Sequence, residues 1–209
     1  PCSRRNRPFD FVDRFPVEND MPPRRFSNVV AFDDGPFPRR HTGRVPVVGT
    51  VYADLRLDGV LTGSVEKDGA DAADELARMI LQSRFEAHIR LVMLQGIALA
   101  GFNVVDVFAL QRRLARPVLV VARRLPDLDA IKVALQAHVP AGTAKWRIIE
   151  RLGPMEPAGP VFIQRVGIDR DAALEAVARF AIHGHVPEPL RTAHLIAGAL
   201  VEGQSRGNP

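Results

Sequence analysis

The 209-residue chain contains a single cysteine, Cys2, and has no apolar run long enough to cross a bilayer, for which about 20 residues are needed. One cysteine excludes an internal disulfide and a zinc site built from several cysteines. The N-terminus also lacks the apolar segment of a secretory signal peptide. These absences predict a soluble protein of the reducing cytoplasm that has no membrane partner.

Neither sign of charge dominates the chain. Lys and Arg number 28 against 24 Asp and Glu, which gives a formal net charge of +4 and a sequence pI of about 10.0. This mild excess is compatible with an anionic partner such as nucleic acid, but it does not by itself demonstrate one. With 46% hydrophobic residues, the chain can bury one sizeable core, so we expect one folded domain.

The first 20 residues differ in character from the rest of the chain. They alternate charged residues with prolines and show no sustained period, and Met21 follows them as a candidate natural start. We predict that residues 1–23 form a disordered N-terminal extension. The pattern of a folded chain begins at Ser27.

Three short apolar runs with turn residues between them come next, and we expect them to form antiparallel strands. They occupy residues 27–32, 45–55 and 59–67. The segment LRLDG between the last two predicts a hairpin whose turn is the dipeptide Asp58-Gly59.

Helical periods then alternate with buried strands. Helices are predicted over residues 70–83, 103–114 and from near Pro126, with strands over residues 89–94 and 117–122 between them. The remaining elements are a Pro- and Gly-rich excursion over 138–160 with one short strand at 145–152, a strand at 161–167, and helices at 170–182 and 187–203.

Alternation of this kind gives parallel strands joined by helical crossovers. The predicted fold class is therefore α/β, a ribonuclease H-like mixed sheet flanked by helices. Three antiparallel strands come first, followed by alternating helices and parallel strands.

Acidic residues follow the predicted strands. In a ribonuclease H-like sheet the first and fourth strands are parallel neighbours, so Asp33 or Asp34 would lie beside Gln95, and Asp68 follows the third strand. Clustered carboxylates bind Mg²⁺ or Mn²⁺, which activate water and stabilise the leaving oxygen in phosphodiester cleavage. The alternative is that the first two acids belong to a turn and that Asp68 caps a helix.

A glycine loop follows the fourth predicted strand. Gly96 and Gly101 have the G-x-x-x-x-G spacing of a phosphate loop, between a strand and a helix that Asn103 opens. Phe102 and Asn103 stand where that motif needs Lys and Ser or Thr, so nucleotide hydrolysis is not predicted. The backbone N–H groups of the loop are still candidates for holding an anion at the helix start.

Two further features are candidates for the site. Arg123 and Arg124 end the strand over residues 117–122 and are able to hold nucleic-acid phosphates, with solvated surface as the alternative. His194 lies on the apolar stripe of the last helix, which predicts a hydrogen-bonded core histidine rather than a catalytic one.

Several long motifs resemble one known family. The segments VVAFDDGPF, VEKDGADAA, GFNVVDVFAL, PVLVVARRLPD and PEPLRTAHLIAGALVEGQSRG occur in the same order and at similar distances as in the endonuclease dU family. That family is related to the endonuclease V proteins, which have ribonuclease H-like folds. The resemblance covers residues 24–207 and therefore predicts a single domain there.

The resemblance implies a metal-dependent endodeoxyribonuclease of DNA repair, a hydrolase that cuts DNA containing deaminated bases, uracil in particular. It puts the acid of the first strand on Asp33, with Asp34 beside it, and the acid of the DG-x-D segment on Asp68, as ligands of Mg²⁺ or Mn²⁺. The expected nucleic-acid contacts are in the glycine loop and at the strand end: Gly96, Gly101, Asn103, Arg123 and Arg124.

The chain departs from the family pattern at the fourth strand. The family usually reads Leu-Asp-Gly there, whereas this chain reads Leu94-Gln95-Gly96. Gln offers one neutral carbonyl oxygen where Asp offers a carboxylate, so a metal site loses a ligand and about one unit of neutralising charge. Two functions therefore stay open: an endonuclease weakened at Gln95, and a catalytically degenerate relative that binds nucleic acid without cutting it.

Overall fold

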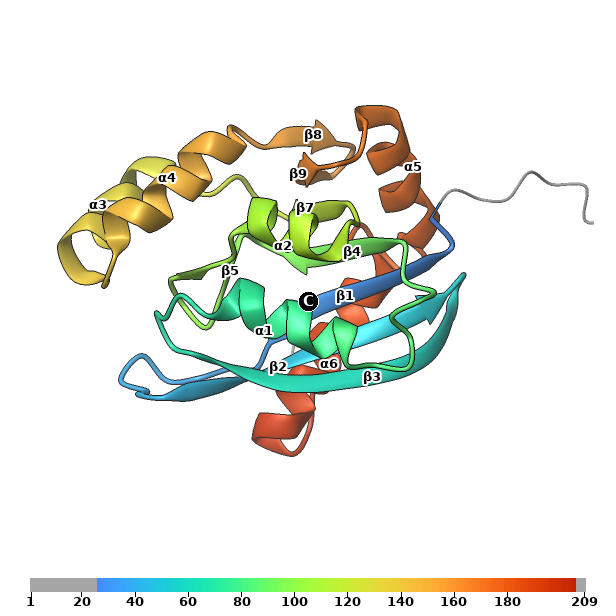
Figure 1. Cartoon of the computed structure of the whole chain (residues 1–209), viewed down its shortest axis with the longest axis horizontal. Helices are drawn as coiled ribbons and strands as arrows, with labels where there is room; N and C mark the ends of the chain where they lie inside the picture. Colours follow the sequence, from blue (N-terminus) through green and yellow to red (C-terminus); the bar gives the residue numbers. More distant parts are fainter. Residues whose placement is uncertain (1–25, 206–209) are drawn as a thin grey trace, which may run out of the picture.

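The sheet at the centre of the molecule has seven strands in the order β3-β2-β1-β4-β7-β9-β8 (Figure 1). The computed structural model describes residues 26–205, so the predicted N-terminal extension lies outside the described residues. β1 (Asn28–Asp34), β2 (Arg44–Ala53) and β3 (Arg56–Glu66) are antiparallel, and β4 (Leu91–Gln95) and β7 (Val118–Ala122) run parallel to β1. The predicted sequence of three antiparallel strands followed by parallel strands with helical crossovers is confirmed.

The sheet ends in an antiparallel hairpin. β8 (Glu156–Ala158) pairs with β9 (Val161–Val166), and β9 runs antiparallel to β7. The predicted strand over residues 161–167 is therefore present.

The turn between β2 and β3 differs from the prediction. It is made by Asp54 and Leu55, between the end of β2 and the start of β3, and Asp54 has a φ of 56°. Asp58 and Gly59 lie inside β3, where the pairing register with β2 shifts. The turn prediction was wrong because Gly59 serves another purpose: a Cβ there would lie 2.2 Å from the ring of Phe85. A glycine inside a strand often marks such a bulge or close approach.

Helices cover both faces of the sheet (Figure 1). α1 (Ala72–Leu81) and α2 (Val107–Leu114) pack on one face, and α5 (Arg170–Phe180) and α6 (Glu188–Glu202) pack on the other. No helix within residues 26–205 has the length and apolar character needed to cross a membrane.

Side chains of the central strands alternate between the two helical layers. Phe32 of β1 and Leu94 of β4 belong to the core under α1 and α2, whereas Ala31 and Met93 belong to the core under α5 and α6. This alternation, which follows from the strand period of two, decides which face each residue at a strand end points to.

A helical hairpin extends from one end of the molecule (Figure 1). α3 (Leu128–His138) and α4 (Gly142–Leu152) pack against each other around Leu135 and Ile149. The short strand predicted over residues 145–152 is wrong, because packing against α3 overrides the β-propensity of its aromatic and branched residues.

The segment after β4 also differs from the prediction. β5 (Ala98–Leu99) and β6 (Asn103–Val104) form a small antiparallel pair, so Asn103 does not open a helix. α2 begins later, after Asp106, whose carboxylate accepts hydrogen bonds from the backbone N–H groups of Phe108 and Ala109. An acidic N-cap of this kind satisfies helix donors that otherwise lack partners.

Asn103 joins three elements through its side-chain amide. It is fully buried, its Nδ2 donates to the Glu66 carbonyl at 2.9 Å and to the Asp71 carboxylate at 2.7 Å, and its Oδ1 accepts from the Ala72 N–H at 3.2 Å. Asp71 itself forms no side-chain cap on α1. Asn103 therefore supplies the cap for α1 from a distant part of the chain.

Replacing Asn103 by Ala is expected to destabilise the fold. The change leaves the buried N–H of Ala72, the Glu66 carbonyl and the Asp71 carboxylate without the Asn103 amide as a partner. We expect the free energy of unfolding to fall by about 3 kcal/mol. Urea denaturation measures this change, with Gln136→Ala on the exposed face of α3 as the control. Equal stability of the two variants would contradict the capping role.

Candidate functional site

The parallel pairing of β1 with β4 brings Asp33 and Gln95 together. Phe32 is in register with Leu94, so the next residue of each strand is Asp33 and Gln95. Both side chains continue the row that faces α6, because residues two apart on a strand point the same way. An acid and an amide therefore lie side by side at the carboxyl ends of β1 and β4, as expected from the sequence.

Asp33 and Gln95 open onto a cleft with a volume of about 520 Å³. His194, Gly198 and Glu202 of α6 form its opposite wall, and Asp34 lies at its edge. The cleft therefore combines carboxylates, an amide and an imidazole, which are groups that bind metal ions and transfer protons.

His194 is part of this cleft rather than of the core. Its Nδ1 lies 2.8 Å from the Asp33 Oδ2, and its side chain is 34% exposed. The predicted core histidine is hydrogen-bonded, but its placement was wrong. His194, Gly198 and Glu202 follow one another at helical spacing on α6, and this line of polar and small residues was the signal in the sequence that could have identified it.

Asp33 and His194 hold a proton between them. Burial raises the pKa of Asp33, and the hydrogen bond with His194 acts in the opposite direction. The hydrogen bond with Asp33 in turn raises the pKa of His194 above its usual range. The pair therefore keeps its proton to a higher pH than either group does in water.

Asp34 points to the opposite face of the sheet from Asp33. Its Oδ2 accepts a hydrogen bond from the Ala100 N–H at 3.1 Å. Burial, together with the neighbouring charge of Asp33, raises the pKa of Asp34 to about 7. A cation near these two acids would reverse this effect, because positive charge stabilises the ionised form.

The Gln95 side chain has an unusual environment. Its Oε1 is buried and accepts no hydrogen bond from any residue in the described part of the chain. A buried acceptor without a partner costs about 1–3 kcal/mol and calls for a ligand or an ordered water. The Gln95 residue lines the same cleft as Asp33 and Asp34, so an amide and two carboxylates, whose oxygens are of the kind that Mg²⁺ or Mn²⁺ prefers, lie around it.

The Asp68 carboxylate has partners that do not line the cleft. Its Oδ1 accepts from the Phe102 N–H at 2.8 Å, and its Oδ2 lies 3.3 Å from the Lys67 Nζ. Gly101 permits this contact, since a Cβ there would lie 2.5 Å from the Asp68 Oδ1. The structure does not place Asp68 among the residues that line the cleft. Its role as a metal ligand stays a prediction.

The acids therefore do not form a complete metal centre by themselves. Among residues 26–205, no three His, Cys, Asp or Glu side chains are grouped so that they could hold a metal ion. An ion in this cleft would depend on the Gln95 oxygen and on water as well as on the carboxylates.

The predicted contact of Asn103 with nucleic acid is wrong, because the side chain is buried. Its side chain has no exposed surface, and all three of its hydrogen bonds are internal. It supports the loop between β4 and α2 and cannot touch a bound strand.

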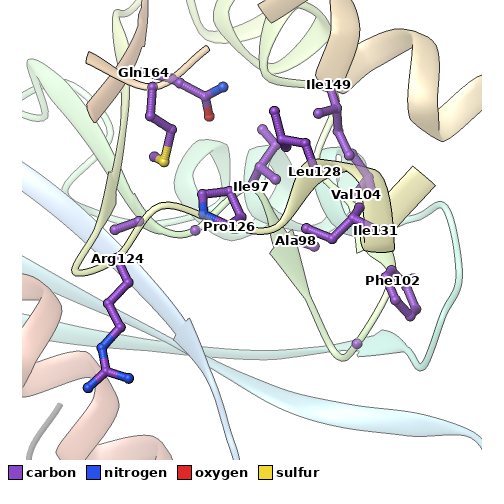
Figure 2. Close-up of a pocket in the computed structure, with 14 residues that line it drawn as sticks. Ile97, Ala98, Phe102, Val104, Arg124, Pro126, Leu128, Ile131, Ile149 and Gln164 are labelled. Atoms are coloured by element: carbon purple, nitrogen blue, oxygen red, sulfur yellow. The ribbon is translucent and has the colours of Figure 1, made fainter. Parts of the chain in front are cut away.

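A second pocket, with a volume of about 260 Å³, opens on the other side of the strand ends. Gly96 and Arg124 line it, and both follow residues that face α6. Figure 2 shows that Ile97, Leu128 and Ile149 lie together in its apolar part, with Gln164 at another wall. The pocket is therefore an apolar cavity with a few polar groups, beside the cleft that holds Gln95.

Arg123 and Arg124 lie in different pockets. Arg124 lines the apolar cavity, whereas Arg123 lines a separate basic pocket near the start of α6. β7 ends at Ala122, so these two arginines belong to the segment that follows the strand, and each lines a different pocket.

Replacing Asp34 by Asn is expected to stabilise the metal-free protein at neutral and higher pH. The folded pKa of about 7 lies above the ordinary 3.8, so wild-type stability falls as pH rises between these values. Asn keeps an acceptor for Ala100 and carries no charge, which should raise the free energy of unfolding at about pH 8 by on the order of 2 kcal/mol.

The difference between Asp34→Asn and wild type should shrink as pH falls and nearly vanish at about pH 3, below the ordinary 3.8, where the acid is protonated in the folded and the unfolded state. Thermal unfolding in EDTA across this pH range measures it, with the exposed Asp129→Asn of α3 as the control. A difference that does not change with pH would contradict the raised pKa.

A family model, a relative of known sequence and a solved structure all match most of this chain. The family model for endonuclease dU matches residues 25–201. A UPF0215 protein of Deinococcus radiodurans is 50% identical over 192 residues, which cover 92% of this chain and 97% of that protein. The crystal structure of a protein of unknown function from Archaeoglobus fulgidus DSM 4304 is 34% identical and has a TM-score of 0.78, over 84% of this chain and 99% of that chain.

More distant solved structures share the fold alone. The endonuclease V of Ciona intestinalis, in complex with a 24mer DNA containing an inosine followed by a ribo-adenosine, is 12% identical and has a TM-score of 0.51. The match covers 80% of this chain and 83% of that chain. The predicted ribonuclease H-like fold is thereby confirmed. The chain belongs to the endonuclease dU family, and its fold is related to that of endonuclease V.

Proposed function

We propose that this protein is a metal-dependent endonuclease that cuts DNA containing deaminated bases, uracil in particular, at the cleft of Asp33. The observation that carries the proposal is the group formed by Asp33, His194 and the unpartnered Oε1 of Gln95 in one open cleft. Membership of the endonuclease dU family supports the same activity. Such an activity belongs to the repair of deaminated DNA.

Asp33, Asp34 and Gln95 are the residues that would hold Mg²⁺ or Mn²⁺. The unpartnered Gln95 oxygen needs a ligand, and the two acids, whose pKa values burial raises, gain from a neighbouring positive charge. A bound divalent ion supplies an activated water and stabilises the leaving oxygen of a phosphodiester. Gln95 contributes no negative charge, so we expect weak metal binding.

His194 is the group best placed to move a proton. Because Nδ1 is hydrogen-bonded to Asp33, the ring orientation is fixed and Nε2 is left as the second proton-exchanging atom. A histidine held in this way gives a proton to a leaving oxygen or takes one from a water. Asp33 therefore both contributes an oxygen donor and orients the imidazole.

The apolar cavity supports recognition of an altered base. Gln95 in the cleft and Gly96 in the cavity are consecutive residues, so a strand held at the cleft has the cavity within reach of one base. The aliphatic walls suit the faces of an extruded base, and Gln164 offers hydrogen bonds to its edge, whereas the Arg124 side chain extends away from these walls (Figure 2). A deaminated base leaves the stack more easily because it pairs poorly.

Cleavage of a uracil-containing oligonucleotide tests the proposed function. Wild-type protein with Mg²⁺ or Mn²⁺ should nick this strand, and Asp33→Asn should lower the rate by about 100-fold or more because it disturbs both the donor set and the imidazole. The matched control is Asp129→Asn, an exposed acid on α3 whose loss should leave the rate unchanged. Folded wild-type protein that binds the DNA but cuts with neither ion would instead identify a catalytically degenerate relative.

Replacing Gln95 by Asp tests whether one missing carboxylate limits the reaction. The variant should cleave at least about tenfold faster than wild type in Mg²⁺, because a charged ligand replaces a neutral one. It should also show a larger rise in melting temperature when Mg²⁺ is added, which reports binding independently of activity. Gln136→Asp on α3 is the control, and unchanged metal response in Gln95→Asp would count against the proposed ligand set.

A further inference from the structure

A basic pocket with a volume of about 430 Å³ lies where β7 ends and α6 begins. Its polar lining consists of Arg123, His183, His185 and Arg191, and no acidic side chain lines it. His183, His185 and Arg123 are exposed, so an anion can reach them from solvent. Nothing in the proposed chemistry at Asp33 uses this pocket.

The basic pocket and the Asp33 cleft lie end to end along one face of α6. Arg191 lines the pocket, and His194, Gly198 and Glu202 line the cleft. These four residues are spaced by three, four and four positions, which places them on one side of a helix. Arg191 and His194 are separated by only about 4.5 Å along the helix axis.

Arg123 links the two sites from the side of the sheet. It follows β7, which pairs with β4 next to Gln95. A ligand bound at Arg123 is therefore close to a ligand bound at His194.

The charges in the pocket favour an anion. The guanidinium of Arg191 pairs with Glu188, which offsets part of its charge. Arg123 forms no ion pair with any residue of the described range 26–205, so its charge is available to a ligand. The two imidazoles add ring N–H donors, and guanidinium and imidazole N–H groups are suited to the non-bridging oxygens of a phosphate.

We propose that this pocket binds a backbone phosphate of the nucleic-acid strand whose neighbouring phosphodiester occupies the Asp33 cleft. The inference rests on the proposed function for the presence of a strand, and it assigns Arg123, His183 and His185 the role of holding that strand in register. A phosphate contact carries no base information, so it strengthens binding to every sequence equally.

Binding measurements without divalent metal test the inference apart from cleavage. Fluorescence anisotropy of labelled single strands, with and without uracil, should show about three- to tenfold weaker binding for Arg123→Gln, to the same extent for both strands. The slope of log affinity against log salt concentration should decrease by about 0.7, as expected for one lost phosphate contact on a single strand. The double variant His183→Gln/His185→Gln should also bind more weakly.

Arg112→Gln is the matched control. Arg112 is an exposed arginine on α2, on the face of the sheet opposite α6, and its replacement removes the same charge. Its affinity should stay within about twofold of wild type, because screening weakens distant charges. Circular dichroism and melting temperature show whether each variant is folded.

Three results would overturn the inference: full affinity in the folded Arg123 and histidine variants, a loss confined to uracil-containing strands, or an equal loss in Arg112→Gln. The proposed endonuclease can fail separately. Wild-type protein that binds with a normal salt dependence and never cuts refutes the catalytic proposal, whereas the phosphate site still holds if Arg123→Gln shows the expected loss.

Discussion

The in-register parallel pairing of β1 with β4 is the constraint on which the rest of the site depends. It puts Asp33 beside Gln95, and a slip of one residue would turn either side chain to the opposite face. The strand alternation sends Asp33 and Gln95 toward α6, whereas Gly96 lines the apolar cavity and Arg123, after β7, lines the basic pocket. One edge of the sheet thus forms an acidic cleft, a basic pocket and an apolar cavity that adjoin one another.

Without a cation, the surroundings of the cleft disfavour the ionised forms of its buried acids. Burial raises the pKa values of Asp33 and Asp34, and the negative charge of Asp33 makes Asp34 still harder to ionise. A third carboxylate at position 95 would increase this repulsion, whereas Gln95 relieves it and leaves an unpartnered oxygen. The neutral amide therefore makes the cleft less costly to form without a bound cation than a third carboxylate would.

The loop between β4 and α2 is held by internal contacts. Asn103 caps α1 and binds β3, and Asp68 accepts a hydrogen bond from Phe102 beside Gly101. The Asp68 carbonyl, between β3 and α1, accepts a hydrogen bond from Lys145 of α4 at 2.6 Å, which joins the β3–α1 connection to the helical hairpin. The side chains of Asn103 and Asp68 thus hold neighbouring segments of the chain together through internal hydrogen bonds.

The sequence by itself determined the order of the five strands β1, β2, β3, β4 and β7 and of the helices α1 and α2 between them, together with the acids of β1 and the amide at Gln95. These follow from local periodicity and from motifs that are continuous in the chain. A strand was predicted over residues 145–152, which belong to α4. The prediction failed because the β-propensity of a short apolar segment does not show that it packs against another helix. Only the tertiary structure decided that His194, 161 residues beyond Asp33, completes the cleft and that Asp68 lies outside it. Such contacts depend on how a helix face packs on a sheet, and that packing is set by the whole core rather than by any neighbouring residues.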